Sequence, residues 1–538
     1  MRSLYFYLAA LAMTAPAYTQ TAPPAPPSVT AGAEFKGLRF DWESVHGAAW
    51  YQLEYRAHQT GPFVQLGANY AGSTTYIRFR LPLHLFDWTW ARYRIAACNS
   101  AGCARSNEVS VDALRRDAVG YFKTPAPNMF EQFGSDTDIS PDGLNFVAAA
   151  TSDIQGDGRT GAAFVFRRNS AGQWAQRARL LPTVAPIGWF ETTTRVSISA
   201  DGDTVVMGVP DYQHGENDAK TGEVFVFHFN GGSWTRTRLL SGNRGRFGRW
   251  VAINDAGDTI ATPYSEGTPR VAIYKLIDGA WKPIRGISNR AGVTEYCEGD
   301  GVLSNDGSTV AEICAVATGG YPVYRDYVRT HSGPNWTVRE EVDLHLTDNP
   351  RTDIEHHALA IDGTGNTIVA QLNDVPSNPN QLDLPSEVQV FSRTGGAYAR
   401  VATFKPGPWR DPEDRITFGR DVAISSDGST IAIGDVLDDG FGTGPRAAPL
   451  TPRGGQYGAV YVYRLKSSWV LANMVKPNFR PPRSDYILNT DYFGRELSLN
   501  GNGQTLIVGA PDESRTATGI GGDWTQGGLQ STGAVFMY

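Results

Sequence analysis

The sequence predicts an all-β protein: a β-sandwich followed by a ring of seven four-stranded units, that is, a seven-bladed β-propeller. Three observations lead to this prediction. The 538 residues include 59 Gly and 11% aromatics but only 19% charged residues, a composition typical of short strands joined by tight turns. A two-part unit recurs seven times from Phe133 onward. The residues before it alternate apolar and polar side chains, as sandwich strands do.

The N-terminal residues 1–17 have the features of a secretory signal peptide. Arg2 precedes a short apolar run, residues 4–13, and a triplet of small residues, 15–17, as in cleavable leaders. The run is too short to span a bilayer, and no later stretch is long enough to do so. An uncleaved anchor is the alternative. We expect a secreted or periplasmic protein with no membrane span after cleavage, in which the Pro-rich residues 18–27 form a stiff linker.

Residues 28–113 form the predicted sandwich. The strand-like runs are "GLRFDWESV", "WYQLEYRA", "TYIRFRLP", "ARYRIAACN" and "NEVSVD". Because successive side chains of a strand point to opposite faces, every second residue lines one face. We therefore expect Trp42 to fill the core. The residues expected to line the strands' faces are Tyr51, Leu53 and Tyr55, and later Tyr93, Ile95 and Ala97.

The four cysteines form an even set in a chain that is expected to be secreted, which favours disulfides. Cys98 and Cys103 flank the turn sequence "NSAG", so a bridge that closes a hairpin is predicted. Cys297 and Cys314 lie on two runs separated by the turn "NDG", and adjacent strands would bring them together. Free buried cysteines are the alternative for each pair. No CxxC or Cys/His spacing indicates zinc.

The repeated unit begins with a predicted β-hairpin. Its copies are "FGSDTDISPDGLNFVAAA" at 133, "TRVSISADGDTVVMGVPD" at 194, "FGRWVAINDAGDTIATP" at 247, "GDGVLSNDGSTVAEICA" at 299, "HHALAIDGTGNTIVAQL" at 356, "FGRDVAISSDGSTIAIGD" at 418 and "FGRELSLNGNGQTLIVGAPD" at 493. Each copy runs through a polar turn with Gly into a second apolar run. The turn glycine supplies the positive φ that tight hairpins need.

The second half of the unit adds two more strands. Its third run reads "GAAFVF" at 161, "GEVFVF" at 222, "PRVAIY" at 269, "SEVQVF" at 386, "GAVYVY" at 458 and "GAVFMY" at 533, with "YPVYRDYV" at 321 as the divergent copy. The fourth run begins with an aromatic residue that we expect to pack between units: Trp174, Trp234, Trp281, Trp336, Tyr398 and Trp469. Four-stranded units in this number are typical of a β-propeller.

The last unit stops before its fourth run, and the missing strand lies ahead of the first unit. The segment "AVGYFKTPAPNMFEQFG" from Ala118 is similar to "SSWVLANMVKPNF" from Ser467, which ends the sixth unit. We therefore predict that residues 118–124 form the outer strand of the last blade and pair with residues 533–538. Such closure buries the apolar faces and strand edges that an open array would expose. The propeller then spans residues 118–538.

The motif F-G-x-x-[V/L]-x-[I/L]-[S/N], the D-G or N-G turn, a strand that ends in G-A-P or an analogue, and G-[A/E]-V-[F/Y]-V-[F/Y] recur through these residues. This pattern resembles the FG-GAP repeat of integrin α-subunit propellers and of their bacterial secreted relatives. The resemblance implies a seven-bladed ring used mainly for binding, with contacts from loops on one face.

The sandwich segment also resembles a known family. Its opening prolines, Trp42, the motif Y-x-L-E-Y-R and the stretch "YRIAACNSAGC" are similar to those of a fibronectin type III domain, of which bacterial versions often carry paired cysteines. The resemblance implies a spacer or recognition module, because this fold has loops and a sheet face but no built-in chemistry. No Arg-Gly-Asp sequence argues for integrin binding.

The FG-GAP resemblance also suggests a cofactor. Many members bind calcium in a D-x-[D/N]-x-D-G-x-x-D loop before the third strand, whose alternate carboxylates converge on the cation. Here Asp153 and Asp157 in "DIQGDGRTG", and Asp435 and Asp439 in "DVLDDGFGT", match this pattern. Other ligand positions hold Gln, Leu, Gly or Thr, so both loops are degraded. The alternative is that these acidic residues are solvated turn residues, in which case the chain needs no cofactor.

The longest insertions occur between the second and third strands of units six and seven. Loops that leave the same edge of a repeat array usually form its binding surface. Phe441, Tyr457 and Trp524 are aromatic residues within these Gly-rich loops, and they are candidates for stacking on a sugar or a peptide. Packing of the loops onto the propeller rim is the alternative.

The sequence therefore predicts a non-catalytic, bacterial-type binding protein whose partner is an extracellular or envelope protein or glycan. The net charge of −7 and the lack of a dense Lys/Arg run argue against nucleic acid. No G-x-S-x-G, H-E-x-x-H or P-loop motif is present, and the neighbouring His356 and His357 would point to opposite faces of a strand. A carbohydrate-active hydrolase or lyase, and a purely structural envelope component, are the alternatives.

Overall fold

The computed structural model describes residues 22–57, 60–85, 90–155, 158–182, 194–210, 222–239, 247–265, 269–287, 295–297, 299–317, 324–344, 358–372, 386–406, 417–438, 444–445, 458–477, 491–523 and 527–538. The chain forms two compact units. The first consists of Met1–Ala33, Leu38–Phe79 and Trp88–Leu114, and the second of Glu34–Gly37, Arg80–Asp87 and Arg115–Tyr538. No helix among the described residues is long and apolar enough to cross a membrane.

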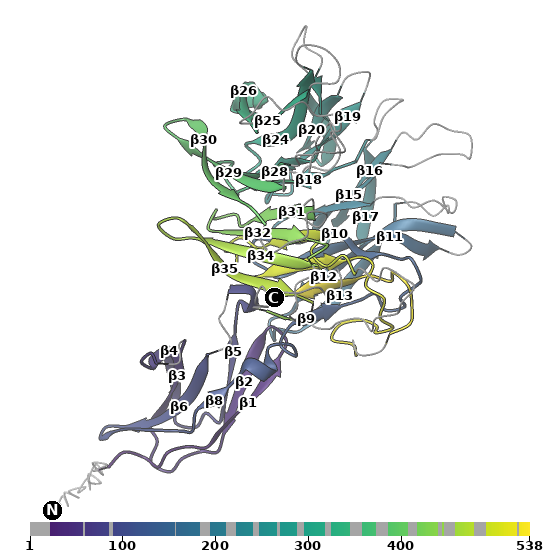
Figure 1. Ribbon diagram of the computed structural model, residues 1–538. Helices are drawn as coiled ribbons and strands as arrows, with labels where there is room; N and C mark the ends of the chain where they lie inside the picture. Colours follow the sequence, from purple (N-terminus) through teal and green to yellow (C-terminus); the bar gives the residue numbers. More distant parts are fainter. Residues whose placement is uncertain are drawn as a thin grey trace, which may run out of the picture. The chain divides into compact units, whose positions relative to one another are not determined.

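The N-terminal strands form two antiparallel sheets (Figure 1). One contains β1 (Val29–Glu34), β2 (Gly37–Trp42) and β5 (Tyr76–Arg80). The other contains β4 (Val64–Ala71), β3 (Trp50–Arg56), β6 (Arg92–Asn99) and β7 (Gly102–Arg105), with β8 (Val109–Ser110) also paired to β6. All five predicted runs contain a strand. The sequence analysis missed β1, β4 and β7.

The alternation along these strands places the predicted residues in the core. Trp42 and Tyr51 are buried with ring centroids 5.1 Å apart. Leu53, Tyr93, Ile95 and Ala97 are also buried, whereas Tyr55 is half-buried. Cys98 and Cys103 lie directly opposite each other on β6 and β7 and form a disulfide. The predicted hairpin-closing bridge is therefore confirmed.

The second unit is built from successive antiparallel sheets, and the described residues contain seven of them. We number them sheets 1 to 7. Sheets 1 to 3 contain β10 (Phe133–Ile139), β11 (Asn145–Gln155), β12 (Gly158–Arg168) and β13 (Trp174–Leu180); β14 (Arg195–Ile198), β15 (Thr204–Val209), β16 (Glu223–Phe229) and β17 (Trp234–Leu239); and β18 (Ala252–Ile253), β19 (Thr259–Ser265), β20 (Pro269–Ile277) and β21 (Ala280–Ile287).

The later sheets follow the same order. Sheets 4 and 5 contain β22 (Glu295–Tyr296), β23 (Gly301–Leu303), β24 (Val310–Ala317), β25 (Tyr324–Ser332) and β26 (Val338–Asp343); and β27 (Leu359–Ile361), β28 (Thr367–Leu372), β29 (Glu387–Thr394) and β30 (Ala397–Phe404). Sheets 6 and 7 contain β31 (Phe418–Ile424), β32 (Thr430–Asp435), β34 (Ala459–Leu465), β35 (Trp469–Lys476) and the short β33 (Gly444–Pro445); and β36 (Glu496–Leu499), β37 (Leu506–Ala510), β38 (Ala534–Met537) and β9 (Gly120–Phe122).

The fourth strand of sheet 7 comes from the start of the unit, as predicted. β9 pairs with β38 in antiparallel register, with Tyr121 opposite Phe536 and Phe122 opposite Val535. The C-terminus accordingly lies beside β9 in Figure 1. Segments at the two ends of the array thus share one sheet, and the unit is a closed β-propeller.

A series of six backbone hydrogen bonds joins the first turns of neighbouring sheets from sheet 2 through sheet 7 to sheet 1. The donor and acceptor pairs are Ala200 to Asp255, Asp255 to Asn305, Asp306 to Gly363, Gly363 to Ser426, Asp427 to Gly501 and Gly501 to Pro141, each 2.8–3.1 Å long. The bond from Gly501 to Pro141 joins sheet 7 to sheet 1. It closes the ring at a second place, independently of β9.

The glycines of the repeated motif lie where the backbones of neighbouring sheets touch. Gly509, in the "GAP" segment of sheet 7, packs on Gly134, in the "FG" segment of sheet 1, so closely that a Cβ on Gly509 would lie 2.2 Å from the Gly134 carbonyl oxygen. Gly208 has the same relation to Gly248 between sheets 2 and 3. Only a residue without a side chain allows two backbones to approach this closely. The repeated glycines therefore hold neighbouring sheets together.

Replacing Gly509 by Ala should lower the free energy of unfolding by about 1–3 kcal/mol, because the added methyl group overpacks a backbone contact. Urea denaturation followed by tryptophan fluorescence would measure the change. The matched control is Gly286→Ala on β21, where a Cβ would meet no atom within 4 Å. Equal stabilities of the two variants would contradict this role of the glycines.

The aromatic residues that lead the fourth strands pack as predicted. Trp174, Trp234, Trp281, Tyr398 and Trp469 are partly buried against the hydrophobic clusters between sheets, and Trp336 is buried in such a cluster. Trp336 lies in the short 3-10 helix Pro334–Trp336 that precedes β26. These residues therefore stabilise the array rather than form a binding surface.

Sheet 4 carries a disulfide where sheet 6 carries the Phe of its Phe-Gly motif. Counted from the turn glycine of each unit, Cys297 is equivalent to Phe418 and Cys314 to Asp435. Phe418 and Asp435 face each other across their ladder, and Cys297 and Cys314 are bonded to each other. The second predicted disulfide is confirmed.

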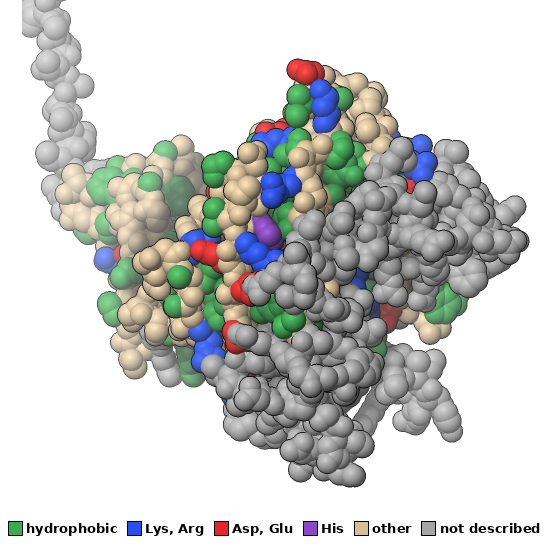
Figure 2. Space-filling view, turned by 90° about the horizontal axis from the view of Figure 1, so that it is seen from above, with side chains coloured by type: hydrophobic (Ala, Val, Ile, Leu, Met, Phe, Trp, Pro, Cys, Tyr) green, Lys and Arg blue, Asp and Glu red, His purple; other side chains and the backbone are tan. Residues whose placement is uncertain are grey.

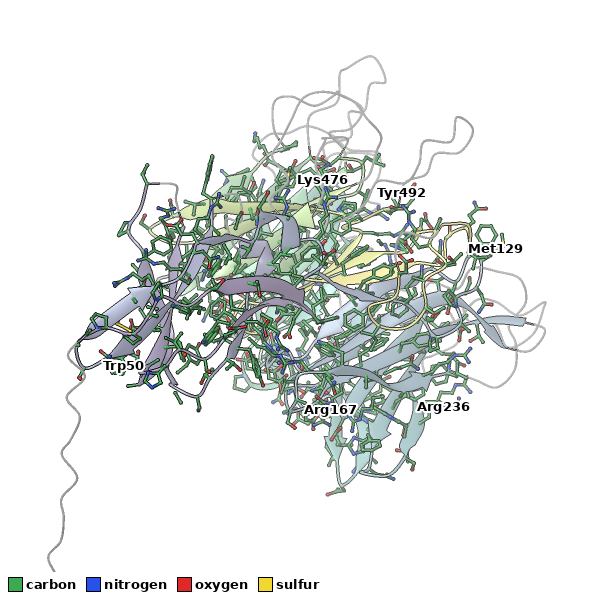
Figure 3. All side chains as sticks on the ribbon, turned by 90° about the horizontal axis from the view of Figure 1, so that it is seen from below. Trp50, Met129, Arg167, Arg236, Lys476 and Tyr492 are labelled. Carbon is green, nitrogen blue, oxygen red and sulfur yellow. A yellow bond between two sulfur atoms is a disulfide. The ribbon has the colours of Figure 1, made fainter. Side chains whose placement is uncertain are left out.

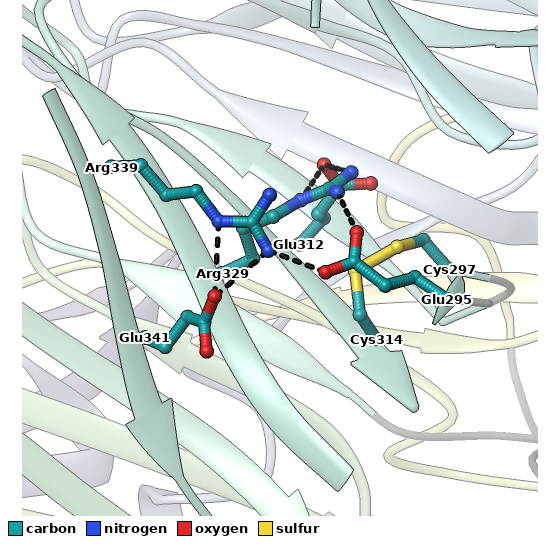
Figure 4. The surroundings of a disulfide bond; sticks show 7 residues. All are labelled: Glu295, Cys297, Glu312, Cys314, Arg329, Arg339 and Glu341. Carbon is teal, nitrogen blue, oxygen red and sulfur yellow. Dashed lines mark hydrogen bonds and ion pairs between the residues drawn. A yellow bond between two sulfur atoms is a disulfide. The ribbon is translucent and has the colours of Figure 1, made fainter. Parts of the chain in front are cut away.

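A buried ion network lies beside this disulfide (Figure 4). Arg329 Nε and Nη2 donate to Glu312 Oε1 at 3.0 and 2.6 Å, and Arg329 Nη1 donates to Glu295 Oε2 at 2.8 Å. Arg339 continues the network from Glu295 to Glu341. The side chain of Arg329 is 0% exposed, and those of Glu295 and Glu312 are 2% and 5% exposed.

The equivalent positions in sheet 6 are apolar or aromatic. Counted from the turn glycine, Glu312 corresponds to Ile433, and the register partners Arg329 and Tyr461 correspond to each other. Sheet 4 thus replaces an Ile–Tyr contact with an ion pair. This is the physical basis of the divergent third run "YPVYRDYV".

Candidate functional site

A water-accessible channel runs along the centre of the propeller and is lined by residues of the innermost strand of every sheet. Its volume is about 260 Å³. The lining strands are β10, β14, β18, β23, β27, β31 and β36, together with residues of the turns that follow some of them. Each inner strand runs from the Phe-Gly end of its unit to the ring of turns. We call the end at which these strands begin the upper end of the channel.

One position of the repeat supplies most of the charge in the channel. It lies seven residues before the turn glycine, and the lining residues at this position are Asp136, Arg195, Trp250, Asp300, Asp421 and Glu496. The sequence analysis did not identify these residues. Aligning the seven copies at this single position would have revealed four acids and one arginine in a ring.

Three of the channel carboxylates bind the backbone of the next sheet. Asp136 Oδ2 accepts the N–H of Val196 at 2.7 Å, and Asp138 Oδ2 accepts the N–H of Ile198 at 2.8 Å. In the same way, Asp421 Oδ2 accepts the N–H of Leu497 at 2.6 Å. Inner strands of different sheets do not pair in a ladder, so their backbone N–H groups need other acceptors. These carboxylates provide them.

Arg195 reaches across the channel. Its Nη1 donates to Glu496 Oε1 at 3.3 Å, so a residue of sheet 2 contacts sheet 7 past sheet 1. Burial alone would lower the pKa of Arg195, but the carboxylates of Glu496, Asp136, Asp300 and Asp421 together raise it above its ordinary value. Burial raises the pKa values of Asp136, Asp421 and Glu496. The upper end therefore holds closely coupled charges of both signs.

Three further arginines occupy equivalent positions in the repeat, each directly after the Phe-Gly pair of its unit: Arg249, Arg420 and Arg495. All three are half-buried. Burial, and then the like charge of Arg495, lower the pKa of Arg420. On the outer face seen in Figure 2, Lys and Arg are also interspersed with Asp and Glu.

A second buried charged cluster fixes the closing strand. Lys123, which follows β9, donates from Nζ to Glu513 Oε2 at 2.5 Å, to the Arg515 carbonyl at 3.0 Å and to Thr532 Oγ1 at 2.6 Å. The hydroxyl of Tyr121 donates to Glu513 Oε1 at 3.1 Å. The Lys123 and Glu513 side chains are both 0% exposed. This cluster binds β9 to the segment between β37 and β38.

Asp491 lies beside this cluster, directly before Tyr492, which is labelled in Figure 3. Its side chain is buried, and its Oδ2 has no hydrogen-bond partner within the described part of the chain. Burial and the negative charges of Glu513 and Asp512 raise the pKa of Asp491, whereas Arg515 and Lys123 lower it, and the resulting pKa is about 8. Asp491 is therefore mostly protonated in the folded protein at neutral pH.

The stability of the second unit should consequently fall as pH rises from 5 to 8. In this range the folded chain keeps the Asp491 proton and the unfolded chain has released it. Unfolding therefore releases a proton, and the free energy of unfolding falls by up to about 1.4 kcal/mol per pH unit. Asp491→Asn should remove this part of the slope. Urea midpoints of both proteins at several pH values would measure it, and parallel profiles would contradict the prediction.

Most of the predicted site residues lie outside the described residues. These are Phe441, Tyr457, Trp524, Asp157 and Asp439, as well as His356 and His357. Asp153 is described at the end of the regular part of β11, where its Oδ2 accepts a hydrogen bond from Arg179 Nε at 2.7 Å. Asp435 ends β32 and accepts a hydrogen bond from Thr417 Oγ1 at 2.7 Å. Each of these two carboxylates thus already has a protein donor.

Comparison with known proteins gives distant structural likenesses. No family model and no curated protein sequence matches the chain. The C-terminal WD40 domain of Sif2 is similar with a TM-score of 0.38 and 14% identity, over 78% of this chain and 98% of that one. Sqt1 from Chaetomium thermophilum has a TM-score of 0.40 and 15% identity, over 78% and 90%. A candidate 6-phosphogluconolactonase from Bacteroides uniformis has 0.38 and 10%, over 80% and 97%. These likenesses are too distant to indicate a function.

Proposed function

We propose that this chain is a secreted, non-catalytic binding protein of bacterial type. Its two units are a fibronectin-III-like domain and a seven-bladed FG-GAP-like propeller. The propeller recognises an extracellular or envelope protein or glycan through loops on one face. The proposal builds on the motif resemblance and on the signal-peptide features of residues 1–17, with which the two disulfides are compatible.

The observation that carries the proposal is the unequal length of the connections at the two ends of the sheets. At one end, short turns join the first and second strands, and backbone hydrogen bonds connect these turns from sheet 2 through sheet 7 to sheet 1. At the other end, β32 ends at Asp435 and β34 begins at Ala459, and β37 ends at Ala510 and β38 begins at Ala534. Long, variable connections on a rigid array are the usual place for recognition.

An array of glycans and extracellular proteins, probed with the purified chain, tests this function. Specific retention of one class without turnover is the expected result. Product formation on a retained glycan would support a hydrolase or lyase instead. Retention by no glycan and no protein of the array would favour a structural role. Calcium in the loops of Asp157 and Asp439 stays a prediction, to be tested by calorimetric titration of chelator-treated protein with Ca²⁺.

A further inference from the structure

Lys123 and Glu513 form a buried ion pair at the point where the ring closes. Lys123 Nζ lies 2.5 Å from Glu513 Oε2, and both side chains are 0% exposed. Burial lowers the pKa of Lys123 below its ordinary value, although the neighbouring carboxyl groups act in the opposite direction. A buried ion pair carries a large desolvation cost, which a reaction that removes both charges would relieve. A lysine whose ammonium is destabilised by burial is also closer to its nucleophilic, neutral form.

The same kind of pair recurs in sheet 6. Lys476, the last residue of β35, is equivalent to Lys123 and donates to a carboxylate oxygen of Asp438. Asp438 and Glu513 each lie four residues after the glycine that packs on the next Phe-Gly segment. The pairing of a buried lysine with a carboxylate is thus part of the repeat in the last two sheets. It provides an internal comparison for the pair at the closure.

Asp491 distinguishes the pair of sheet 7 from that of sheet 6. It lies two residues before the Phe-Gly pair of its unit, where the sequence of the sixth unit has Ile416. The Asp491 side chain is buried, and its Oδ2 has no hydrogen-bond partner within the described ranges. The charges of Glu513 and Lys123 both act on its pKa of about 8, so its carboxyl group lies near both. A buried acid that keeps its proton beside an amine and a carboxylate can transfer protons between them.

The other contacts of the pair orient the two groups for a reaction. The Tyr121 hydroxyl donates to Glu513 Oε1 at 3.1 Å, and Arg515 Nε lies 3.6 Å from the same oxygen. Both would stabilise negative charge on Oε1 if the carboxyl carbon became tetrahedral. Thr532 Oγ1 and the Arg515 carbonyl hold the Lys123 amine at 2.6 and 3.0 Å. The amine is therefore fixed against the carboxyl group, which replaces a bimolecular encounter.

We propose that Lys123 and Glu513 condense to an intramolecular amide, an isopeptide bond, with Asp491 as the proton-transfer residue. A proton first passes from the ammonium to the carboxylate, which gives a neutral amine and a carboxylic acid. The amine lone pair then attacks Glu513 Cδ, so that the Nζ–Cδ bond forms and the Cδ–Oε2 bond breaks. Asp491 gives its proton to Oε2 and regains one from Nζ. One water leaves, and no other reactant is needed. This bond would close the propeller covalently, independently of the proposed binding function.

Mass spectrometry of the purified full chain tests the bond. After denaturation and reduction of both disulfides, the intact mass should be lower by one water than the mass calculated from the determined termini. Peptide mapping should then yield a branched peptide that joins Lys123 to Glu513. The map is needed because succinimide formation at an Asp-Gly sequence also removes water. On a denaturing gel the parent should migrate faster than Lys123→Arg, because the amide joins residues 390 positions apart.

Three variants complete the test. Lys123→Arg keeps the positive charge without the amine and should show the full calculated mass. Asp491→Asn should form the bond at least about 100-fold more slowly than the parent in the same cell-free synthesis, as expected for the loss of a general acid and base. Lys476→Arg, in the equivalent pair of sheet 6, should form the bond as the parent does. Circular dichroism would check that each variant is folded.

The parent alone decides the main point, whether or not each variant folds. A parent with the full calculated mass, or a water loss that maps away from Lys123 and Glu513, would overturn the inference. Bond formation at the parental rate in Asp491→Asn would overturn the role of Asp491.

Discussion

Replacing Phe122 by Ala should lower the free energy of unfolding of the second unit by about 3–5 kcal/mol. Phe122 is 0% exposed. Its ring centroid lies 4.8 Å from that of Phe146, 5.4 Å from that of Phe166 and 5.8 Å from that of Trp174. All three belong to sheet 1, whereas Phe122 belongs to sheet 7. The substitution therefore leaves a cavity at the point where the ring closes.

Urea denaturation followed by near-UV circular dichroism measures this effect. Because closure couples the sheets, we expect the whole unit to unfold at lower urea in one transition. Met129→Ala, at a residue 44% exposed, is the control and should change stability by less than about 0.5 kcal/mol. A Phe122→Ala protein that melts like the parent would show that the closing strand contributes little.

Replacing Arg329 by Met should cost about 3–5 kcal/mol, because Glu312 would keep its charge in a buried site without a partner. The double variant Glu312→Ile/Arg329→Met should recover most of this loss, since it restores the kind of apolar contact that Ile433 makes in sheet 6. Glu295 keeps Arg339 as a partner in both variants.

Thermal and urea denaturation of the three proteins would measure this recovery. Lys282→Met is the control, because it breaks an ion pair between Lys282 and Asp278 whose side chains are 49% and 87% exposed, and such exposed pairs contribute little. If the double variant were no more stable than Arg329→Met, unpaired charge would not be the cause of the loss.

Much of the fold could be predicted from the sequence because the residues of the repeated motif are required by the packing of the sheets. The glycines of "FG" and "GAP", such as Gly134 and Gly509, are required where backbones touch. The pairing of Tyr121 with Phe536 followed from a missing fourth strand, and the structure confirms it. The sandwich strands β4 and β7 were missed because β4 is mostly exposed and lacks a buried alternation, and β7 is only four residues long.

The channel could not be predicted in the same way. Arg195 and Glu496 are 301 residues apart in sequence and belong to sheets that do not adjoin. Their contact depends on the number of sheets in the ring and on its diameter, which no local pattern encodes. The aromatic loop residues Phe441, Tyr457 and Trp524 stay a prediction.

The strand that completes sheet 7 imposes an order on biosynthesis. β9 is made before β10, the first strand of sheet 1, whereas its partner β38 is made after every other strand of the array. During translation, the apolar edge formed by Tyr121 and Phe122 stays unpaired until the whole propeller has been made. Non-local pairing of this kind slows folding and leaves aggregation-prone intermediates. Cells that overproduce this protein should therefore need chaperone holdases to obtain it in good yield.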